Sequence, residues 1–316
     1  MRLDSFKISI IIPVYYNKNN LIVLYDDLKQ KFIDKINYQY ELVFIDDGSL
    51  DNSYEAMKEI ASKDVNVKII RLSRNFGSHA AILCGLANCT GDAAVVKAAD
   101  LQEPTEMLHE MIDSWKIGNN VVLAVRQSRD EPLSQTFFSD LYYEITRRIA
   151  LSNMPKKGFD VYLIDRKVIN VLVSNNERNS ALTGQILWSG FKTGIVYYNR
   201  LERKIGKSKW TLKKKIKLVM DTIYSFTSLP ISIVLMIGTV SLLVGIIWAI
   251  VLIVLKFRGE IDIVGWTSMF IFNLIAFGIT MLTLGIIGEY LWRTFDASRN
   301  RPPYIIEDSN LEDKHE

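Results

Sequence analysis

The chain is poor in the residues that build metal clusters and disulfide frameworks. It has two cysteines, Cys84 and Cys89, and three histidines in 316 residues. The spacing of the cysteines matches no zinc-binding pattern, and no second His or Cys is suitably spaced from His79 or His109. We therefore interpret these histidines as structural, and we expect the protein in a reducing compartment.

A strong net charge and an N-terminal export signal are also missing. The 38 Lys and Arg residues nearly balance the 35 Asp and Glu residues, and a net charge of +3 is too small to indicate a nucleic-acid binder. Residues 1–16 contain a short apolar run without the layout of a signal peptide. We therefore expect any membrane attachment to come from the C-terminal part.

Charged residues are almost absent between positions 229 and 288. Leu229–Leu255 contains 27 residues without a charge, and Ile263–Gly288 contains 26. Each run exceeds the roughly 20 residues that cross a bilayer core. Two such runs in succession predict a transmembrane hairpin over 228–292, with spans at about 229–255 and 263–288, rather than a buried helix of a soluble protein.

The charges around this hairpin predict its orientation. The connection KFRGEID is balanced, whereas eight Lys and Arg residues without an acid lie between Arg203 and Lys217. The positive-inside rule then places both flanks in the cytoplasm. We interpret 211–227 as a juxtamembrane amphipathic helix and 293–316 as a cytoplasmic tail. The basic cluster is either a solvated helix face or a contact for anionic headgroups and phosphates, and its position favours the second.

The first half of the chain alternates strand-like and helix-like segments. The expected strands are Ile8–Val14, Tyr40–Ile45, Val67–Leu72, Ala93–Lys97 and Asn120–Val125. The expected helices between them are Leu21–Ile33, Ser53–Ser62, His79–Asn88 and Thr105–Lys116. This order predicts an α/β domain over 1–210 with a mostly parallel sheet and with ligands at the carboxyl ends of its strands. Further along, Phe137–Ala150 and Ala181–Gly190 are expected helices, and Gly158–Leu163 is an expected strand.

The first polar motif follows the second expected strand. It reads Asp46-Asp47-Gly48-Ser49 and is followed by Asp51. Carboxylates at the end of a strand can accept hydrogen bonds from the N–H of a base or from ribose hydroxyls. An ordinary turn is the alternative, since Asp, Gly and Ser favour turns.

The second polar motif follows the fourth expected strand and reads ADLQEP at 99–104. The carboxylate of Asp100 and the amide oxygen of Gln102 can both face a divalent cation held by a diphosphate. Magnesium and manganese favour such oxygen ligands. The alternative is a strand-to-helix turn capped by Asp100.

Four segments in order resemble family 2 glycosyltransferases of the GT-A fold. They are PVYY at 13–16, FIDDGSLDNS at 44–53, RLSRNFGSHAA at 71–81 and ADLQEP at 99–104. The chain is most similar to the polyprenyl-phosphate glycosyltransferases, which include dolichol-phosphate mannose synthases and the bacterial GtrB and ArnC types. GFDVYLIDR at 158–166, GKSKW at 206–210 and a terminal hairpin ending in IGEYLWR resemble the same branch.

The resemblance implies an inverting transfer of one sugar from a nucleotide-diphosphate sugar to a polyprenyl phosphate such as undecaprenyl phosphate. The expected donor carries UDP first and GDP second, and the expected cofactor is Mg²⁺ or Mn²⁺. The implied place is the inner (plasma) membrane, with several spans, both termini in the cytoplasm and a possible homo-oligomer. The expected roles are nucleotide binding for Pro13, Tyr15, Asp46, Asp47 and Ala99, metal binding for Asp100 and Gln102, and catalysis or phosphate contact for Asp100, Arg126, Arg203 and Lys209.

The chain departs from the family pattern at the metal motif. Where the family commonly has Asp-Ala-Asp, it reads Ala98-Ala99-Asp100, so one carboxylate is absent. This substitution is the one feature in favour of an inactive membrane scaffold. A processive polysaccharide synthase is the other alternative, but the chain has Gln185-Ile186-Leu187-Trp188 instead of a Gln-x-x-Arg-Trp motif and offers two spans for a channel.

Overall fold

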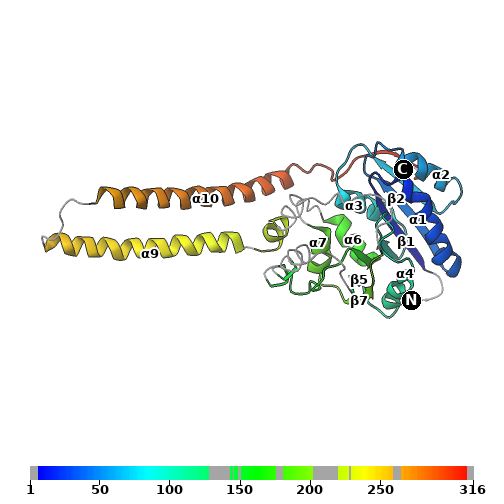
Figure 1. The fold of residues 1–316 in the computed structure, drawn as a ribbon, viewed down its shortest axis with the longest axis horizontal. Helices are drawn as coiled ribbons and strands as arrows, with labels where there is room; N and C mark the ends of the chain where they lie inside the picture. Colours follow the sequence, from blue (N-terminus) through cyan, green and yellow to red (C-terminus); the bar gives the residue numbers. More distant parts are fainter. Residues whose placement is uncertain are drawn as a thin grey trace.

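A computed structural model of the protein describes most of the chain as a sheet-based domain from which two long helices extend (Figure 1). The described residues are 6–127, 143–144, 146–148, 151–175, 181–201, 220–227, 229–258 and 265–311. Most of the helix expected at 137–150, and the first nine residues of the expected amphipathic helix, lie outside this part. Residues 220–226 of that helix are helical.

The strands of the described part form one mixed sheet. They are β1 (Lys7–Val14), β2 (Gln39–Asp46), β3 (Val67–Leu72), β4 (Ala93–Val96), β5 (Val121–Arg126), β6 (Val161–Asp165), β7 (Thr193–Tyr198) and β8 (Ile306–Ser309). Their order is β7-β5-β6-β4-β1-β2-β3-β8. β1 pairs in parallel with β2 and β4, β2 with β3, and β5 with β7, whereas β6 and β8 run antiparallel to their neighbours. The prediction of an α/β sheet is confirmed; in the described part the sheet is mixed, with four parallel and three antiparallel pairings.

Helices cover both faces of this sheet. They are α1 (Lys18–Lys31), the short η1 (Ile33–Lys35), α2 (Ser53–Ala61), α3 (Ser78–Asn88), α4 (Met107–Lys116), α6 (Arg166–Ser174) and α7 (Leu182–Trp188). The alternating side chains of β1 enter two cores: Ile10 and Ile12 pack with α1, α2 and α4, and Ile11 packs with α3 and α6. A strand covered on both faces is apolar at nearly every position, which explains the apolar run of β1, interrupted at 8–14 by the buried Ser9 alone.

The structure contains elements that the sequence pattern did not predict. α6, β7 and β8 have no counterpart among the expected segments, and β6 begins at Val161 rather than Gly158. β8 comes from the predicted tail and pairs with β3. Its four residues, IEDS, are mostly exposed, so no apolar pattern marks it as a strand.

Two long helices, α9 (Leu229–Phe257) and α10 (Trp266–Ser298), extend side by side away from the sheet (Figure 1). In the described part, one candidate span meets the length and composition criteria for crossing a bilayer, Leu229–Trp248 of α9, with a mean hydropathy of 2.5. α10 continues past the predicted end of the second span at Gly288 to Ser298.

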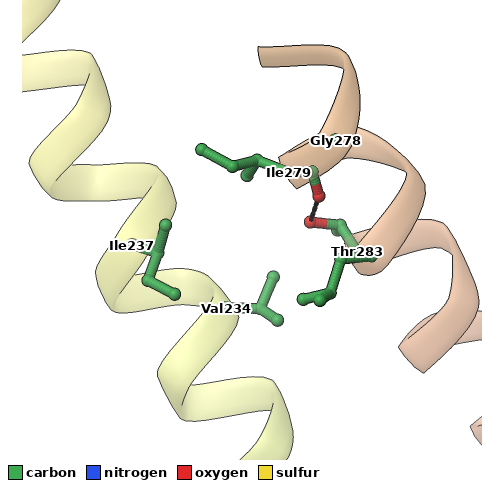
Figure 2. Close-up of a pocket in the computed structure, with 6 residues that line it drawn as sticks. Val234, Ile237, Gly278, Ile279 and Thr283 are labelled. Carbon is green, nitrogen blue, oxygen red and sulfur yellow. Dashed lines mark hydrogen bonds between the residues drawn. The ribbon is translucent and has the colours of Figure 1, made fainter. Parts of the chain in front are cut away.

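The two helices meet across an apolar groove of about 180 Å³. Figure 2 shows side chains of both helices turned toward it. The lining residues are Val234, Ile237, Gly278, Ile279, Leu282 and Thr283. Thr283 donates its hydroxyl hydrogen to the carbonyl of Ile279 at 2.8 Å, so its polar group is satisfied within its own helix.

Candidate active site

Polar side chains collect at the edge where the parallel strands end. β1 ends next to β2 at the pair Val14 and Asp46, and β5 ends next to β7 at the pair Arg126 and Tyr198. β6 runs in the opposite direction, so Asp160, just before it, reaches the same edge. Residues far apart in sequence therefore line one edge, as expected for ligand sites of open α/β sheets.

Asp46 is a fully buried carboxylate, and one of its oxygens lacks a hydrogen-bond partner among the described residues. Its Oδ1 accepts the backbone N–H of Ser49 at 3.0 Å, and its Oδ2 has no hydrogen-bond partner among the described residues. The guanidinium Nε of Arg71 is 3.9 Å from this Oδ2. Burial raises the pKa of Asp46, while Ser49 and the charge of Arg71 oppose the rise. This oxygen retains the capacity to accept a hydrogen bond from an N–H donor such as that of a base.

Asp47 joins two of the sequence motifs. Its Oδ1 accepts the N–H of Phe76 at 2.7 Å, and its Oδ2 accepts the N–H of Gly77 at 2.9 Å. Burial raises the pKa of Asp47, and these two backbone bonds oppose the rise. Gly48 has a φ of +69°, and a Cβ there would lie 2.6 Å from the carbonyl carbon of Arg74. The Asp-Asp-Gly turn thus packs directly on the loop at 74–77. Asp47 acts on the site by holding the backbone of this loop in place.

The segment after β1 is held by the same turn. Pro13 is in register with Ile45 in β2. The N–H of Tyr16 donates to Ser49 Oγ at 2.9 Å, and the N–H of Asn17 donates to Ser53 Oγ at 3.1 Å. These serines, which the sequence reasoning did not assign, fix the backbone beside Tyr15.

The motif after β4 binds the segment after β7. Asp100 Oδ1 accepts the N–H of Gln102 at 3.3 Å, and Ala99 before it is buried. The Oε1 of Gln102 accepts a hydrogen bond from the guanidinium of Arg200, and the backbone N–H of Leu201 donates to the carbonyl of Gln102 at 2.9 Å. Arg200 is therefore a site residue that the sequence reasoning missed, and its place in the basic NRLERK stretch was the available signal.

Arg126 has a carboxylate partner at the same edge. It forms an ion pair with Asp160, and its Nε donates to the hydroxyl of Tyr198 at 3.4 Å. Burial lowers the pKa of Arg126, but Asp160 and Tyr198 raise this pKa by more than burial lowers it. The net pKa lies above its usual value, so the guanidinium stays charged. The predicted phosphate-binding residues Arg203 and Lys209 lie outside the described residues.

A buried ion pair lies beneath the second motif. Lys97 Nζ donates to the carbonyl of Glu103 at 2.6 Å and is 3.8 Å from its Oε2. Burial raises the pKa of Glu103 to about 7 against the opposing charge of Lys97, and Asp100 and Asp160 add to the rise. The sequence reasoning missed this pair, although a lysine that ends an apolar strand was a signal.

Comparison with known proteins decides the family of this chain. A family model described as Glycosyl transferase family 2 matches residues 9–173. The chain belongs to this family. The glycosyltransferase is 38% identical to the uncharacterized glycosyltransferase YkcC of Bacillus subtilis over 95% of this chain and 93% of the relative. It is 32% identical to the prophage bactoprenol glucosyl transferase homolog of Escherichia coli K12 over 95% and 98%.

Among solved structures, the glycosyltransferase matches a mannosyltransferase from Pyrobaculum calidifontis in complex with GDP-Man and Mn²⁺. The TM-score is 0.47 and the identity 16%, over 64% of this chain and 58% of that chain. The family match at 9–173 spans β1 to α6 and thus includes both polar motifs. The predictions of family 2 membership and of glycosyltransferase activity are confirmed.

The oxygen atoms near Asp100 fit a divalent cation whose remaining ligands come from a diphosphate. In the part of the glycosyltransferase that the structure describes, no three His, Cys, Asp or Glu side chains form a site made of protein alone. Magnesium is commonly held by one or two carboxylates together with substrate phosphates and water. Asp100 supplies one carboxylate, and Gln102 supplies an amide oxygen that already accepts from Arg200.

Proposed function

We propose that this glycosyltransferase moves a single sugar from a nucleotide-diphosphate sugar, with UDP-hexose as the first candidate, to a polyprenyl phosphate in the membrane. The main observation in support is that the buried Asp46 and the Asp100–Gln102 motif lie at one sheet edge with Arg126 and Arg200. Similarity over almost the full length to a protein named as a bactoprenol glucosyl transferase homolog supports the acceptor class.

The nucleotide would bind over β1 and β2. Asp46 would accept a hydrogen bond from the base at its open Oδ2, and Asp47 would keep the loop at 74–77 in place beneath the nucleotide. Pro13, Tyr15 and Ala99 would provide the walls of this part of the site. Because Asp46 is buried, a correctly placed N–H donor gains more there than it would in water.

The transfer step would take place next to Asp100. An oxygen of the acceptor phosphate attacks the anomeric carbon, and the bond from that carbon to the diphosphate oxygen breaks with inversion. The electron pair leaves with the nucleoside diphosphate. The phosphate is already anionic near neutral pH, so no strong general base is needed.

Cationic groups would stabilise the charge that develops on the departing diphosphate. A magnesium or manganese ion, when bound with the diphosphate, would supply Lewis-acid stabilisation there. Asp100 and Gln102 would hold that ion, and Arg126, Arg203 and Lys209 would bind phosphate groups of donor or acceptor. The ion pair with Asp160 keeps Arg126 pointed at this edge before a phosphate arrives.

The proposal includes a hairpin over 228–292, with α9 and α10 as its two spans. β1 and β8 belong to one sheet, so the chain on either side of the helices returns to the same domain. A chain that crosses a membrane in α9 must then cross back. We place the domain over 1–210, the amphipathic segment 211–227 and the tail 293–316 on the cytoplasmic side, in agreement with the basic flanks.

A donor screen tests this function. Purified full-length protein is incubated with undecaprenyl phosphate, Mg²⁺ or Mn²⁺ and a panel of UDP- and GDP-sugars, and the lipid product is identified by mass. We expect one product that is heavier by a single sugar residue. A ladder of longer products would indicate a processive synthase, and the absence of any lipid product with every donor would support an inactive scaffold.

A further inference from the structure

The C-terminal strand β8 is attached to the sheet by more than its ladder. The N–H of Ser73 donates to the carbonyl of Ile305 at 3.0 Å. The side chain of Asn310 accepts the N–H of Ile69 at 2.7 Å and donates to the carbonyl of Val67 at 3.0 Å. Tyr304 and Leu311, on either side of β8, pack against the core that contains α3. Figure 1 shows this segment crossing from α10 to the outer edge of the sheet.

This docking brings an acidic side chain to the nucleotide end of the site. Arg71 in β3 has its Nε 3.3 Å from Glu307 Oε2 and 3.9 Å from Asp46 Oδ2. The guanidinium also lies 5.5 Å from the centre of the buried Tyr54 ring. Arg71 is therefore placed between a carboxylate of β8 and the carboxylate at the end of β2.

Two carboxylates compete for one guanidinium in this arrangement. Arg71 Nε and Asp46 Oδ2 are buried, and neither atom has a hydrogen-bond partner among the described residues. If Glu307 lost its charge, Arg71 would be drawn toward Asp46, because the attraction of this buried carboxylate at 3.9 Å would no longer be opposed by Glu307. A closer pair would occupy the oxygen that a base needs.

We propose that Glu307 is a positioning residue for nucleotide binding, and that it acts by holding Arg71 back from Asp46. The C-terminal strand is then part of the donor site, although it lies more than 200 residues after β3 in the sequence. The inference rests on the proposed role of Asp46 as a nucleotide contact. It concerns residues 304–311, outside the matched family segment at 9–173.

Titration calorimetry with UDP and with GDP on the full-length protein tests this inference. Glu307→Gln should weaken the Kd of the nucleotide that binds by roughly twofold to fivefold, the range for a partly exposed charge pair. The KM for the donor sugar nucleotide should rise by a similar factor, while kcat and the KM for the lipid phosphate stay unchanged.

Glu59→Gln is the matched control. Glu59 lies in α2, has a similarly exposed side chain (53% against 51%), and pairs with Lys63 at 2.7 Å. The substitution removes the same charge from an ion pair that does not include Arg71, so it should leave the nucleotide Kd unchanged. Equal Kd values for Glu307→Gln and Glu59→Gln would overturn the inference.

Two further variants separate this inference from the function on which it rests. If Asp46→Asn leaves the nucleotide Kd unchanged, Asp46 does not contact the nucleotide and the proposed donor site is wrong. If Asp46→Asn weakens binding but Glu307→Gln does not, the role proposed for Glu307 is wrong while the proposed donor site stands. In an Arg71→Gln background, Glu307→Gln should no longer change the nucleotide Kd, because no guanidinium remains to move toward Asp46. An effect of equal size in both backgrounds would contradict the role of Arg71.

Discussion

Asp46 and Asp47 are adjacent in the chain, yet their carboxylates face different partners. Asp46 has an oxygen without a hydrogen bond among the described residues, whereas both oxygens of Asp47 accept backbone N–H groups of the loop at 74–77. One carboxylate thus keeps an acceptor without a partner, and the other holds the loop in place. The strand alternation places neighbours in different surroundings.

Asp47→Asn should destabilise the protein more than Asp46→Asn does. An asparagine keeps one acceptor oxygen, so the N–H of Phe76 or Gly77 would lose its partner, at a cost of about 1–3 kcal/mol. Thermal unfolding of both variants in detergent measures the difference. Equal midpoints would show that the loop does not depend on these two hydrogen bonds.

Asp100→Asn should lower turnover by about a hundredfold or more without changing the thermal midpoint. Asparagine keeps the shape and an oxygen ligand but loses the charge that helps to hold a hard cation. Gln102→Ala should have a smaller effect, because an amide oxygen carries no net charge. Rates of nucleotide release with lipid phosphate, measured across a series of Mg²⁺ concentrations, give the comparison.

Chelation and a restored acid serve as controls for the metal. EDTA should stop the reaction of the parent protein, and added Mg²⁺ or Mn²⁺ should restore it. Ala98→Asp should keep the activity or lower the metal concentration that is required. Full activity in EDTA would refute the metal assignment and leave Arg126 and the other cations to stabilise the leaving group.

At the scale of elements, Glu41 connects four neighbouring parts of the sheet. This buried residue of β2 accepts hydrogen bonds from Ser9 in β1 at 2.6 Å and from the N–H of Thr90, before β4, at 2.5 Å. Lys68 of β3 lies 2.8 Å from its Oε2. Burial alone would raise the pKa of Glu41, but Lys68, Ser9 and Thr90 lower it from 4.5 to about 2. The charged carboxylate therefore stabilises the amino edge of the sheet.

Glu41→Gln should remove a pH-dependent part of the stability. The folded pKa is below the unfolded value, so this stabilisation is fully present above about pH 4.5 and is lost as the pH falls toward 2. At pH 7 the substitution should cost about 2–3 kcal/mol. Below pH 4.5 the difference from the parent should shrink, as measured by thermal unfolding across the pH range.

Glu59→Gln is the control, because it is the same substitution at an exposed ion pair. Glu59 is an exposed α2 residue that pairs with Lys63 at 2.7 Å, and an exposed pair is worth less than about 1 kcal/mol. It should therefore lower the stability much less than Glu41→Gln. A difference between Glu41→Gln and parent that stays constant down to pH 2 would contradict the depressed pKa.

The end of α10 is joined to the helical residues 220–226. Arg293 Nη2 lies 2.7 Å from Asp221 Oδ1, and its Nε lies 2.9 Å from Glu289. The rings of Tyr224 and Tyr290 meet edge to face at 5.4 Å. Glu289 and Arg293 therefore form a pair one turn apart, and Asp221 extends it to a second element.

At the scale of the whole molecule, both ends of the described chain belong to one sheet. β1 starts near the N-terminus and β8 lies near the C-terminus, and β8 pairs with β3 in the sheet that contains β1 (Figure 1). α9 and α10 leave this domain and return to it side by side. The proposed hairpin would thus have β1 and β8 on one face of the membrane.

Cysteine labelling in intact cells tests this topology. A membrane-impermeant maleimide should label Glu260→Cys, in the connection between the helices, and should not label Val65→Cys, which is 98% exposed on the domain. The native Cys84 and Cys89 are buried and should contribute little background. After permeabilisation both variants should react, and labelling of Val65→Cys before that step would overturn the orientation.

The sequence by itself determined the fold class, the family and the position of the two motifs. The isoleucine run of β1 predicts a strand covered on both faces; Asp46 ends β2, and Asp100 lies shortly after β4. These inferences depend on residues close to one another in the chain. Apolar periodicity and turn-forming residues can be recognised within such short segments. The charge-free runs 229–255 and 263–288 predicted the two long helices for the same reason.

Only the tertiary structure decided which distant residues meet. Gln102 binds Arg200, and Arg71 lies between Asp46 and Glu307, because the strand order places β7 beyond β5 and β8 beside β3. β8 is short, polar and mostly exposed, so its sequence gives no signal of a strand. β7 has β-branched and aromatic residues that favour a strand, but nothing in its sequence specifies which neighbour it pairs with. Their position follows from hydrogen bonds offered by the open edges of the sheet. Edge pairing depends on backbone groups that every residue carries, and the local sequence therefore does not specify it.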